Sequence, residues 1–448
     1  MLRYGGNTAT LLHPLVLLAA LVAAGLVWGL PKKYVLIPVI AVMVLTPTGQ
    51  RLVVPGADFT IHRIMLACVW ARLLITGEHR SLKPTPIDKA VMWWVAATVV
   101  SYTILWSSLG AFINRLGFAY DLLGTYFLTR TTVAQASDLK RVLKALVWIG
   151  VIVAILMVVE TGAGRNPFAS LGGLPETSEL REGRFRAQGP FSHSIMAGTF
   201  GATLLPLSIG LWWMGGRWLP VAGIVAACTI TLASASSGPA LTLIAGIVAL
   251  CLWPLREHMT WVRRATLAGL IALQIVMKAP VWYLLNRVDV VQGSTGWHRS
   301  FLIDNFVWRF EEWVLVGTRY TSTWGQGLVD QTNQYVTIGA SGGLLTLVLF
   351  VVVLRRCFAG LRGFDRSRRA ARWQHTHWAL GSALFAHLIA FVGATYFGQM
   401  ADVWYLFLGT VSAASGIAVE AVETRERYVR NERPLARVWP PQFGSDNA

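Results

Sequence analysis

The chain has 448 residues, of which 54% are hydrophobic and only 14% are charged, and its formal net charge is +17. Soluble domains carry roughly 25% charged residues, so this composition excludes an ordinary soluble protein and indicates a membrane protein. The apolar residues form continuous runs rather than an alternating pattern, which favours helices over a transmembrane barrel.

Thirteen apolar stretches follow one another along the chain, and about 20 residues are enough to cross a hydrocarbon core of ~30 Å. The stretches are roughly 11–29, 34–46, 60–76, 90–107, 112–129, 142–159, 193–213, 219–233, 238–253, 261–279, 333–354, 376–397 and 402–419. The second is short and the fifth contains Arg115 and Asp121, so twelve spans is the alternative. The first stretch follows a single basic residue, Arg3, and is too long for a cleaved signal, so we expect a retained helix. We predict an all-α integral membrane protein with 12 or 13 transmembrane helices.

The basic residues are distributed unevenly between the two predicted sides of the membrane. With thirteen spans and the C-terminus inside, 26 of the 39 Lys and Arg residues lie on the cytoplasmic side. Residues 1–420 then form one polytopic domain, whose long loops 160–192 and 280–332 face outward. The basic loop 355–375 and the basic tail 421–448 face the cytoplasm. Membrane topology therefore accounts for the charge without a nucleic-acid partner.

The four cysteines suggest neither a disulfide framework nor a metal site. Three lie in predicted spans and one lies at the cytoplasmic edge; they are Cys68, Cys228, Cys251 and Cys357. No stretch fits a P-loop or a dinucleotide fingerprint, which argues against an ATP-driven pump. We expect no cofactor.

The first outward loop places Arg181, Arg184 and Arg186 within six residues, directly before a span that begins near His193. One interpretation is anchoring at the membrane interface. The other is phosphate binding, because arginine is suited to bidentate recognition of phosphate and basic residues are otherwise scarce on this side. A lipid diphosphate head group would be an apt ligand.

The second outward loop has a flexible entry that ends in Trp297, His298 and Arg299. Apolar residues then recur at 3–4 residue spacing from Leu302 to Val314, which predicts an amphipathic helix of about four turns in the membrane interface. Exposed aromatic, amide and carboxylate groups follow up to the next span and suit sugar rings, although an aromatic belt would also explain the tryptophans. We expect glycan or acceptor contacts from Gln188, Trp297, Trp324, Asn333 and Tyr335.

Three features together resemble the O-antigen ligase and polymerase family of bacterial envelope glycan proteins. The first is the stretch 126–144, a span that leads into the basic turn Ser137 to Arg141. The second is the segment from Arg184 to His193 followed by a Gly-containing span. The third is the large outward loop that closes on Asn333 and Tyr335 before a Gly-Gly helix start. They cover roughly residues 110–420, and each motif alone is weak.

The resemblance implies a metal-independent glycosyltransferase that moves a glycan from undecaprenyl diphosphate to an acceptor at the outer face of the bacterial inner membrane. By the family pattern, Arg184, Arg186 and Arg299 would bind the donor diphosphate, with His193 as a further phosphate contact. The family places a histidine before the asparagine that starts the last loop segment, whereas this chain has Thr332 there. His298 or Asp330 would then be the base that accepts the acceptor proton. The alternative function is a non-catalytic envelope-glycan component or a transporter of lipid-linked sugars.

We expect two further polar sites to have structural roles. His387, near the centre of its span, is expected to hydrogen-bond a neighbouring helix rather than act in chemistry. The segment from Ser234 to Pro239 is expected to be a tight outward turn, the alternative being a broken helix whose N-terminal amides face an anion.

Overall fold

The computed structural model describes residues 10–54, 57–287, 296–325, 327–329, 331–362 and 368–432. Its long helices are α1 (Pro14–Gly29), α2 (Leu36–Leu45), α3 (Ile61–Ile75), α4 (Pro86–Trp106), α5 (Leu109–Thr132), α6 (Ala136–Ala163), α7 (Ser194–Trp213), α8 (Trp218–Ala233), α9 (Ser237–Cys251), α10 (Met259–Val276), α13 (Gln334–Gly360), α14 (Arg368–Gly393) and α15 (Gln399–Glu432). The smaller elements are two antiparallel hairpins, β1 (Arg51–Val54) with β2 (Ala57–Thr60) and β3 (Glu179–Arg181) with β4 (Arg184–Arg186), and the loop helices η5 (Val281–Arg287), α11 (Gly296–Trp308), α12 (Phe310–Trp313) and η6 (Ser322–Trp324).

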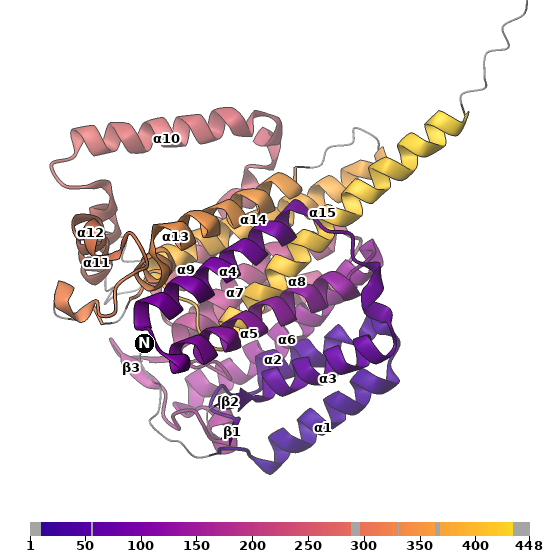
Figure 1. The fold of residues 1–448 in the computed structure, drawn as a ribbon, viewed down its shortest axis with the longest axis horizontal. Helices are drawn as coiled ribbons and strands as arrows, with labels where there is room; N and C mark the ends of the chain where they lie inside the picture. Colours follow the sequence, from indigo (N-terminus) through magenta and orange to yellow (C-terminus); the bar gives the residue numbers. More distant parts are fainter. Residues whose placement is uncertain are drawn as a thin grey trace, which may run out of the picture.

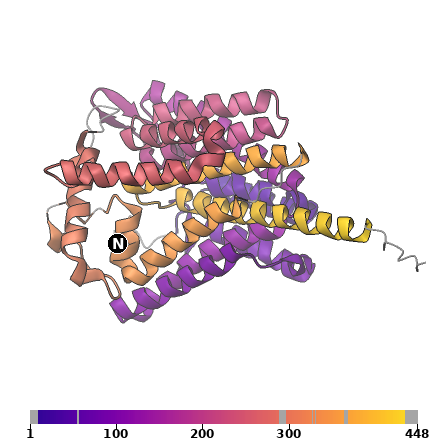
Figure 2. The same ribbon diagram turned by 90° about the horizontal axis from the view of Figure 1, so that it is seen from above.

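The long helices form a bundle whose connecting loops gather mainly at one end (Figure 1). That end carries β3, α11, α12 and the start of α13, and α15 runs from there to the opposite end and beyond it (Figure 2). Helix α7 lies in the interior, where it packs against α8, α9 and α14 and most of its side chains are buried. We call the loop-bearing end the loop end of the bundle.

A helix occurs at each of the thirteen stretches that the sequence predicts, so the helical fold class is confirmed. Six helices of the described chain, α4, α6, α7, α13, α14 and α15, are long and apolar enough to cross a membrane. A seventh span results if α9 and the helical segment up to Val276 count as one, although they are bent by 75°. The several apolar helices indicate a multi-pass membrane protein.

Helix α10 differs from the others because none of its residues is buried in the bundle. It stands apart at the top of Figure 1, and its exposed side chains are mainly apolar. Within the described chain it contacts the short helical segments on either side of it, so its apolar surface is left for the lipid phase of a membrane.

The structure differs from the sequence prediction in the second loop. The predicted four-turn helix of the second loop is divided at Arg309 into α11 and the short α12. Its apolar residues partly form a small core of their own with the start of α13, because Leu302, Trp313 and Trp324 are all buried there. Helix α15 continues past residue 420 to Glu432, so no break in the helix marks the predicted tail.

The stretch at 126–144 has a structural explanation. Asp138 forms a capping box with Gln135 at the start of α6 and pairs with Arg141. Such a box satisfies amides that the first helical turn leaves free. The basic turn therefore fixes a helix start rather than a site.

Candidate functional site

Arg186 lies at the end of the β3–β4 hairpin and is only 4% exposed. Its Nη1 pairs with Oε2 of Glu179 at 2.7 Å, and its Nη2 donates to Oγ of Ser236 at 2.8 Å. The backbone amide of Ala187 donates to the carbonyl of Ala233 at 3.0 Å, so the hairpin is fixed to the turn between α8 and α9. The Nε of Arg186 is buried without a partner in the described part of the protein.

Arg299, in the first turns of α11, lies against Gly238, two residues after the Ser236 that contacts Arg186. Cβ atoms added to Gly238 at the start of α9 and to Gly393 at the end of α14 would each lie 3.6 Å from its guanidinium. The guanidinium therefore lies in van der Waals range of both helix ends. Its Nε is buried, and no hydrogen bond or ion pair of Arg299 occurs among the described residues. Burial, helped by the charge of Arg181, lowers the pKa of Arg299.

The Arg299 side chain lines a cavity of about 170 Å³ between α7, α9 and α14. The remaining lining is mostly apolar and includes Leu241, Leu285, Ile389 and Val392, with hydroxyl groups from Thr199 and Thr242. Pockets that bury a drug-sized ligand measure about 300–1,000 Å³, so this cavity fits a head group rather than a whole lipid.

The turn between α8 and α9 joins these features. Residues 234–236 form the turn and α9 begins at Ser237, so the tight-turn prediction is confirmed. The start of α9 nevertheless lies beside Arg186 and Arg299. Positive groups beside this helix start are what the alternative interpretation, a broken helix that faces an anion, would need. The amides at a helix start carry a partial positive charge. Arg186, Arg299 and the start of α9 form what we call the arginine site.

The arginine site has more positive than negative charge. Glu179 is the one carboxylate in ion-pair contact with it among the described residues, and its side chain is 56% exposed. Buried charges without partners are costly, and an anion removes that cost by supplying the missing acceptors. The arrangement can bind a phosphate or diphosphate at the edge of an apolar cavity.

Glu160 at the end of α6 holds the first loop in shape. It is fully buried and accepts hydrogen bonds from Ser178 Oγ at 2.9 Å and from the amides of Gln188 and Gly189 at 3.0 and 2.8 Å. The Nε2 of Gln188 is buried and lacks a partner in the described chain. Gln188 is thus placed by the hydrogen bond of its backbone amide.

The other two predicted phosphate contacts differ from Arg186. Arg184 is exposed on the β4 strand. His193 caps the start of α7, where its Nδ1 accepts the amide of Ile195 at 3.1 Å. Because Nδ1 is used in the cap, His193 has a structural function that the prediction did not include.

His298 lies beside the residue at which the chain departs from the family pattern. Its Nε2 is 2.9 Å from the carbonyl oxygen of Gly327, and its Nδ1 is 3.4 Å from Oγ1 of Thr332. A carbonyl only accepts, so Nε2 is the nitrogen that donates, and in the neutral imidazole Nδ1 is then the acceptor that faces Thr332. The other predicted base, Asp330, lies outside the described residues.

The predicted sugar contacts are mostly used in packing. Trp324 is 3% exposed and donates to Glu312 Oε2 at 2.8 Å, so the prediction that its ring is exposed is wrong. Asn333 is 2% exposed and caps α13, accepting the amides of Tyr335 and Val336 and donating to the carbonyl of Val392. The hydroxyl of Tyr335 donates to the carbonyl of Leu388 at 3.2 Å. These two residues are therefore also structural.

Trp297 is the predicted sugar contact that remains accessible. It is 62% exposed and stacks on Phe301 with ring centroids 5.2 Å apart. His387 is 1% exposed and its Nδ1 lies 2.8 Å from the Tyr396 hydroxyl, so its partner lies in the connection after its own helix rather than on the neighbouring helix that was predicted. No group of three acidic, histidine or cysteine side chains that could hold a metal occurs in the described ranges.

Sequence reasoning missed Gly393 as part of the site, whereas Ser236 and Gly238 lie in the segment for which an anion site was the alternative interpretation. The Ser- and Gly-rich turn was visible in the sequence, but nothing in it indicated that Arg186 and Arg299 would meet there. Neither the family models nor the curated proteins that were compared with this chain gave a match.

Proposed function

We propose that this chain is a glycosyltransferase of the O-antigen ligase or polymerase type. It would act at the outer face of a bacterial inner membrane, with 12 or 13 spans, the long loops outward and the C-terminus in the cytoplasm. Its donor would be a glycan linked to undecaprenyl diphosphate, and the acceptor is an unnamed hydroxyl compound. The observation that carries the proposal is the partnerless Arg299 side chain at the edge of an apolar cavity, beside Arg186 and the start of α9.

The geometry supports a polar environment for the diphosphate of the donor and an apolar environment for its prenyl chain. The diphosphate would accept hydrogen bonds from Arg299 and from the free Nε of Arg186, while the apolar lining of the cavity would contact the adjoining prenyl carbons. Negative charge builds on the diphosphate as it leaves, so fixed positive groups stabilise the transition state more than the ground state.

In the reaction, the acceptor oxygen would form a bond to the anomeric carbon of the donor sugar. The bond from that carbon to the diphosphate oxygen would break, and its electron pair would leave with undecaprenyl diphosphate. Nδ1 of His298 would take the acceptor proton, with Nε2 held by the Gly327 carbonyl. A base whose second nitrogen is held in this way has a fixed tautomer and orientation.

One observation favours the alternative function, a protein that binds the lipid-linked glycan without reacting it. Nδ1 of His298 faces Thr332, so an acceptor would have to displace the threonine hydroxyl to reach the base. A non-catalytic envelope component or a transporter would keep the arginine site and would need no base.

The test uses the purified full chain, radiolabelled undecaprenyl-diphosphate oligosaccharide and an envelope lipid extract as the source of acceptor. We expect release of undecaprenyl diphosphate by the wild type, loss of release in His298→Gln and loss of donor binding in Arg299→Gln. Arg309→Gln is the matched control, because Arg309 is exposed in the same loop and pairs with Glu312.

Three results discriminate the candidates. Donor binding that needs Arg299, with no release by the wild type, would leave the non-catalytic function. Release that persists in His298→Gln would remove His298 as the base. Binding and release that are unchanged in Arg299→Gln would refute the arginine site and the proposal with it.

A further inference from the structure

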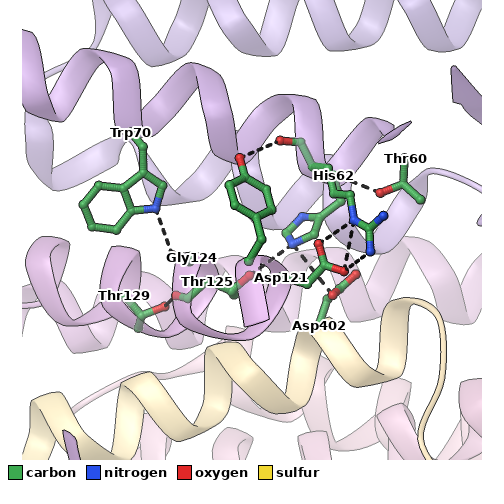
Figure 3. A network of polar contacts seen from close by, with 10 residues as sticks. Thr60, His62, Trp70, Asp121, Gly124, Thr125, Thr129 and Asp402 are labelled. Atoms are coloured by element: carbon green, nitrogen blue, oxygen red, sulfur yellow. Dashed lines mark hydrogen bonds and ion pairs between the residues drawn. The ribbon is translucent and has the colours of Figure 1, made fainter. Parts of the chain in front are cut away.

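A second group of ionisable side chains, distinct from the residues of the arginine site, lies where α3, α5 and α15 meet (Figure 3). It comprises His62 and Arg63 at the start of α3, Asp121 in α5 and Asp402 in the first turn of α15. Charged groups within an apolar bundle are expensive, so such a cluster in a membrane protein points to a function.

Arg63 and Asp121 satisfy each other. Nε and Nη2 of Arg63 donate to Oδ1 and Oδ2 of Asp121 at 2.8 and 2.7 Å, and Nη1 donates to the carbonyl of Asp58 at 2.8 Å. This bidentate pair is neutral as a whole. The pair therefore provides no positive charge for the second carboxylate of the cluster, that of Asp402.

Asp402 has no hydrogen-bond donor to its carboxylate among the described residues. Its nearest partner is Nε2 of His62 at 3.8 Å, and the Asp402 side chain is 18% exposed. His62 is 7% exposed; its Nε2 lies 3.1 Å from Thr125 Oγ1, and its Nδ1 is buried without a partner in the described part of the chain. In Figure 3 the imidazole lies between Thr125 and Asp402.

The charges of the cluster do not balance when His62 is neutral. Arg63 contributes +1 and the two aspartates contribute −2, so these residues carry one negative charge that no group in ion-pair contact compensates; Arg115 lies over the Tyr102 ring and pairs with neither aspartate in the described chain. Isolated charges are unfavourable in apolar surroundings, and one added proton removes this one. The proton has two places to reside, the imidazole of His62 and the carboxylate of Asp402.

A metal cation is the weaker explanation of the missing charge. No three acidic, histidine or cysteine side chains lie close enough together to hold a metal ion in the described ranges, and this holds for His62, Asp121 and Asp402 too. The Asp121 carboxylate is already held by the guanidinium of Arg63, whose charge would repel a cation. A proton needs no such set of ligands.

We propose that His62 and Asp402 form a proton-binding site, which holds one shared proton at the junction of α3, α5 and α15. The other charged or titratable groups around it are Arg63 on α3, Arg115, Tyr120 and Asp121 on α5, Tyr405 on α15 and Asp58 in the β1–β2 hairpin. Helices α2 and α7, which also pack against α15, carry no charged residue. The inference is independent of the proposed glycan chemistry.

The site is close to the segments that border the cavity. Asp402 lies one helical turn from Gln399, whose Nε2 donates to the carbonyls of Thr46 and Pro190. Gly393 and Ala394, at the other end of the α14–α15 connection, line the cavity. A proton bound at Asp402 would therefore alter the charge at the start of the helix that follows the cavity wall.

The test records two signals from the purified full chain between about pH 5 and pH 8, the range in which an unperturbed histidine titrates. Nitrogen NMR of labelled histidine, with the His62 signal assigned from His62→Gln, reports whether the imidazole is protonated. Infrared difference spectra report whether Asp402 is protonated, through a carboxyl band that is absent in Asp402→Asn.

We expect at least one of the two groups to carry the proton in the wild type near neutral pH. If His62 carries it, Asp402→Asn should make His62 neutral; if Asp402 carries it, the band should persist in Asp58→Asn. Asp58 is the control because it lies in the same region and its side chain is 56% exposed. A neutral His62 together with an ionised Asp402 in the wild type would overturn the proposal. Signals that depend on the sodium concentration rather than on pH would also overturn it, because they would show that the site binds a metal cation instead of a proton.

Discussion

Arg130 and Arg299 lie toward opposite ends of the bundle and differ in their partners. Arg130 is 8% exposed; its Nε donates to Asp88 Oδ1 at 3.1 Å and its Nη2 donates to the carbonyl of Lys83 at 2.8 Å. Arg299 has neither an ion pair nor a hydrogen bond in the described chain. The end of α4 near Leu105 contacts Arg319 of the second loop, so Asp88 at its start lies away from the loop end.

Asp88 has all the partners that a carboxylate needs. Besides Arg130, it accepts from the Tyr126 hydroxyl at 2.5 Å, from Ser412 Oγ at 3.0 Å and from the amide of Thr85 at 2.7 Å. These contacts join α4, α5 and α15. A buried polar network with every member satisfied serves stability, whereas the buried Arg299 donor without an acceptor borders a cavity that can hold one. The predictions below test this difference.

The largest effect is expected at the satisfied network. Asp88→Ala leaves Arg130 buried without its counter-charge and should lower the free energy of unfolding by about 3–5 kcal/mol. Denaturation of the detergent-solubilised protein measures the loss, and Asp58→Ala, on the exposed hairpin, is the control that should cost little. An equal loss in both variants would show that Asp88 is no more important than a surface carboxylate.

At the arginine site we expect a loss of activity without a loss of stability. Arg299→Gln should lower glycan transfer by about 10²–10³-fold, as removal of one group that stabilises transition-state charge does. Stability should stay the same or rise, because the variant removes a charge that lacks a partner. Parallel transfer and denaturation measurements test this, and a large loss of stability would mean that Arg299 is structural like Arg130.

Glu160 resembles Asp88, because its buried carboxylate has hydrogen-bond partners. It differs from Asp88 in that it positions the first loop, which carries Arg186. Glu160→Ala removes the acceptor of three hydrogen bonds and should destabilise that loop by about 1–3 kcal/mol. Hydrogen exchange at the amides of Gln188 and Gly189 should accelerate. Glu176→Ala, whose side chain is 75% exposed, should leave both amides protected; slow exchange in Glu160→Ala would show that the loop has other supports.

The smallest effect is expected at the exposed arginine of the hairpin. Arg184→Gln should weaken binding of undecaprenyl diphosphate by less than about 1 kcal/mol, and added salt should remove the difference because exposed charges are screened. Arg186→Gln should weaken binding more, and the loss should persist in salt, since Arg186 is 4% exposed. Equal effects of the two variants would contradict the assignment of the inner arginine to the site.

The sequence by itself determined the helical fold class and the position of the helices. Long apolar runs with few charges satisfy their backbone hydrogen bonds internally as helices, and this depends on local composition. The scarcity of basic residues on the side of the two long loops also identified Arg184 and Arg186 as candidates, whereas Arg299 was a candidate only through the family resemblance. The division of the second-loop helix at Arg309 and the burial of Trp324 did not follow from periodicity, since both depend on a small core made with α13.

Only the tertiary structure decided which polar residues have partners. Arg130 and Arg299 cannot be distinguished by residue type, and both lie beside apolar segments. The difference arises because Asp88, from another helix, meets Arg130, whereas two glycines and an apolar cavity surround Arg299. In the same way, only the meeting of α3 and α15 brings His62 to Asp402, 340 positions apart in the sequence. Such pairings depend on long-range packing, which the local pattern of residues does not contain.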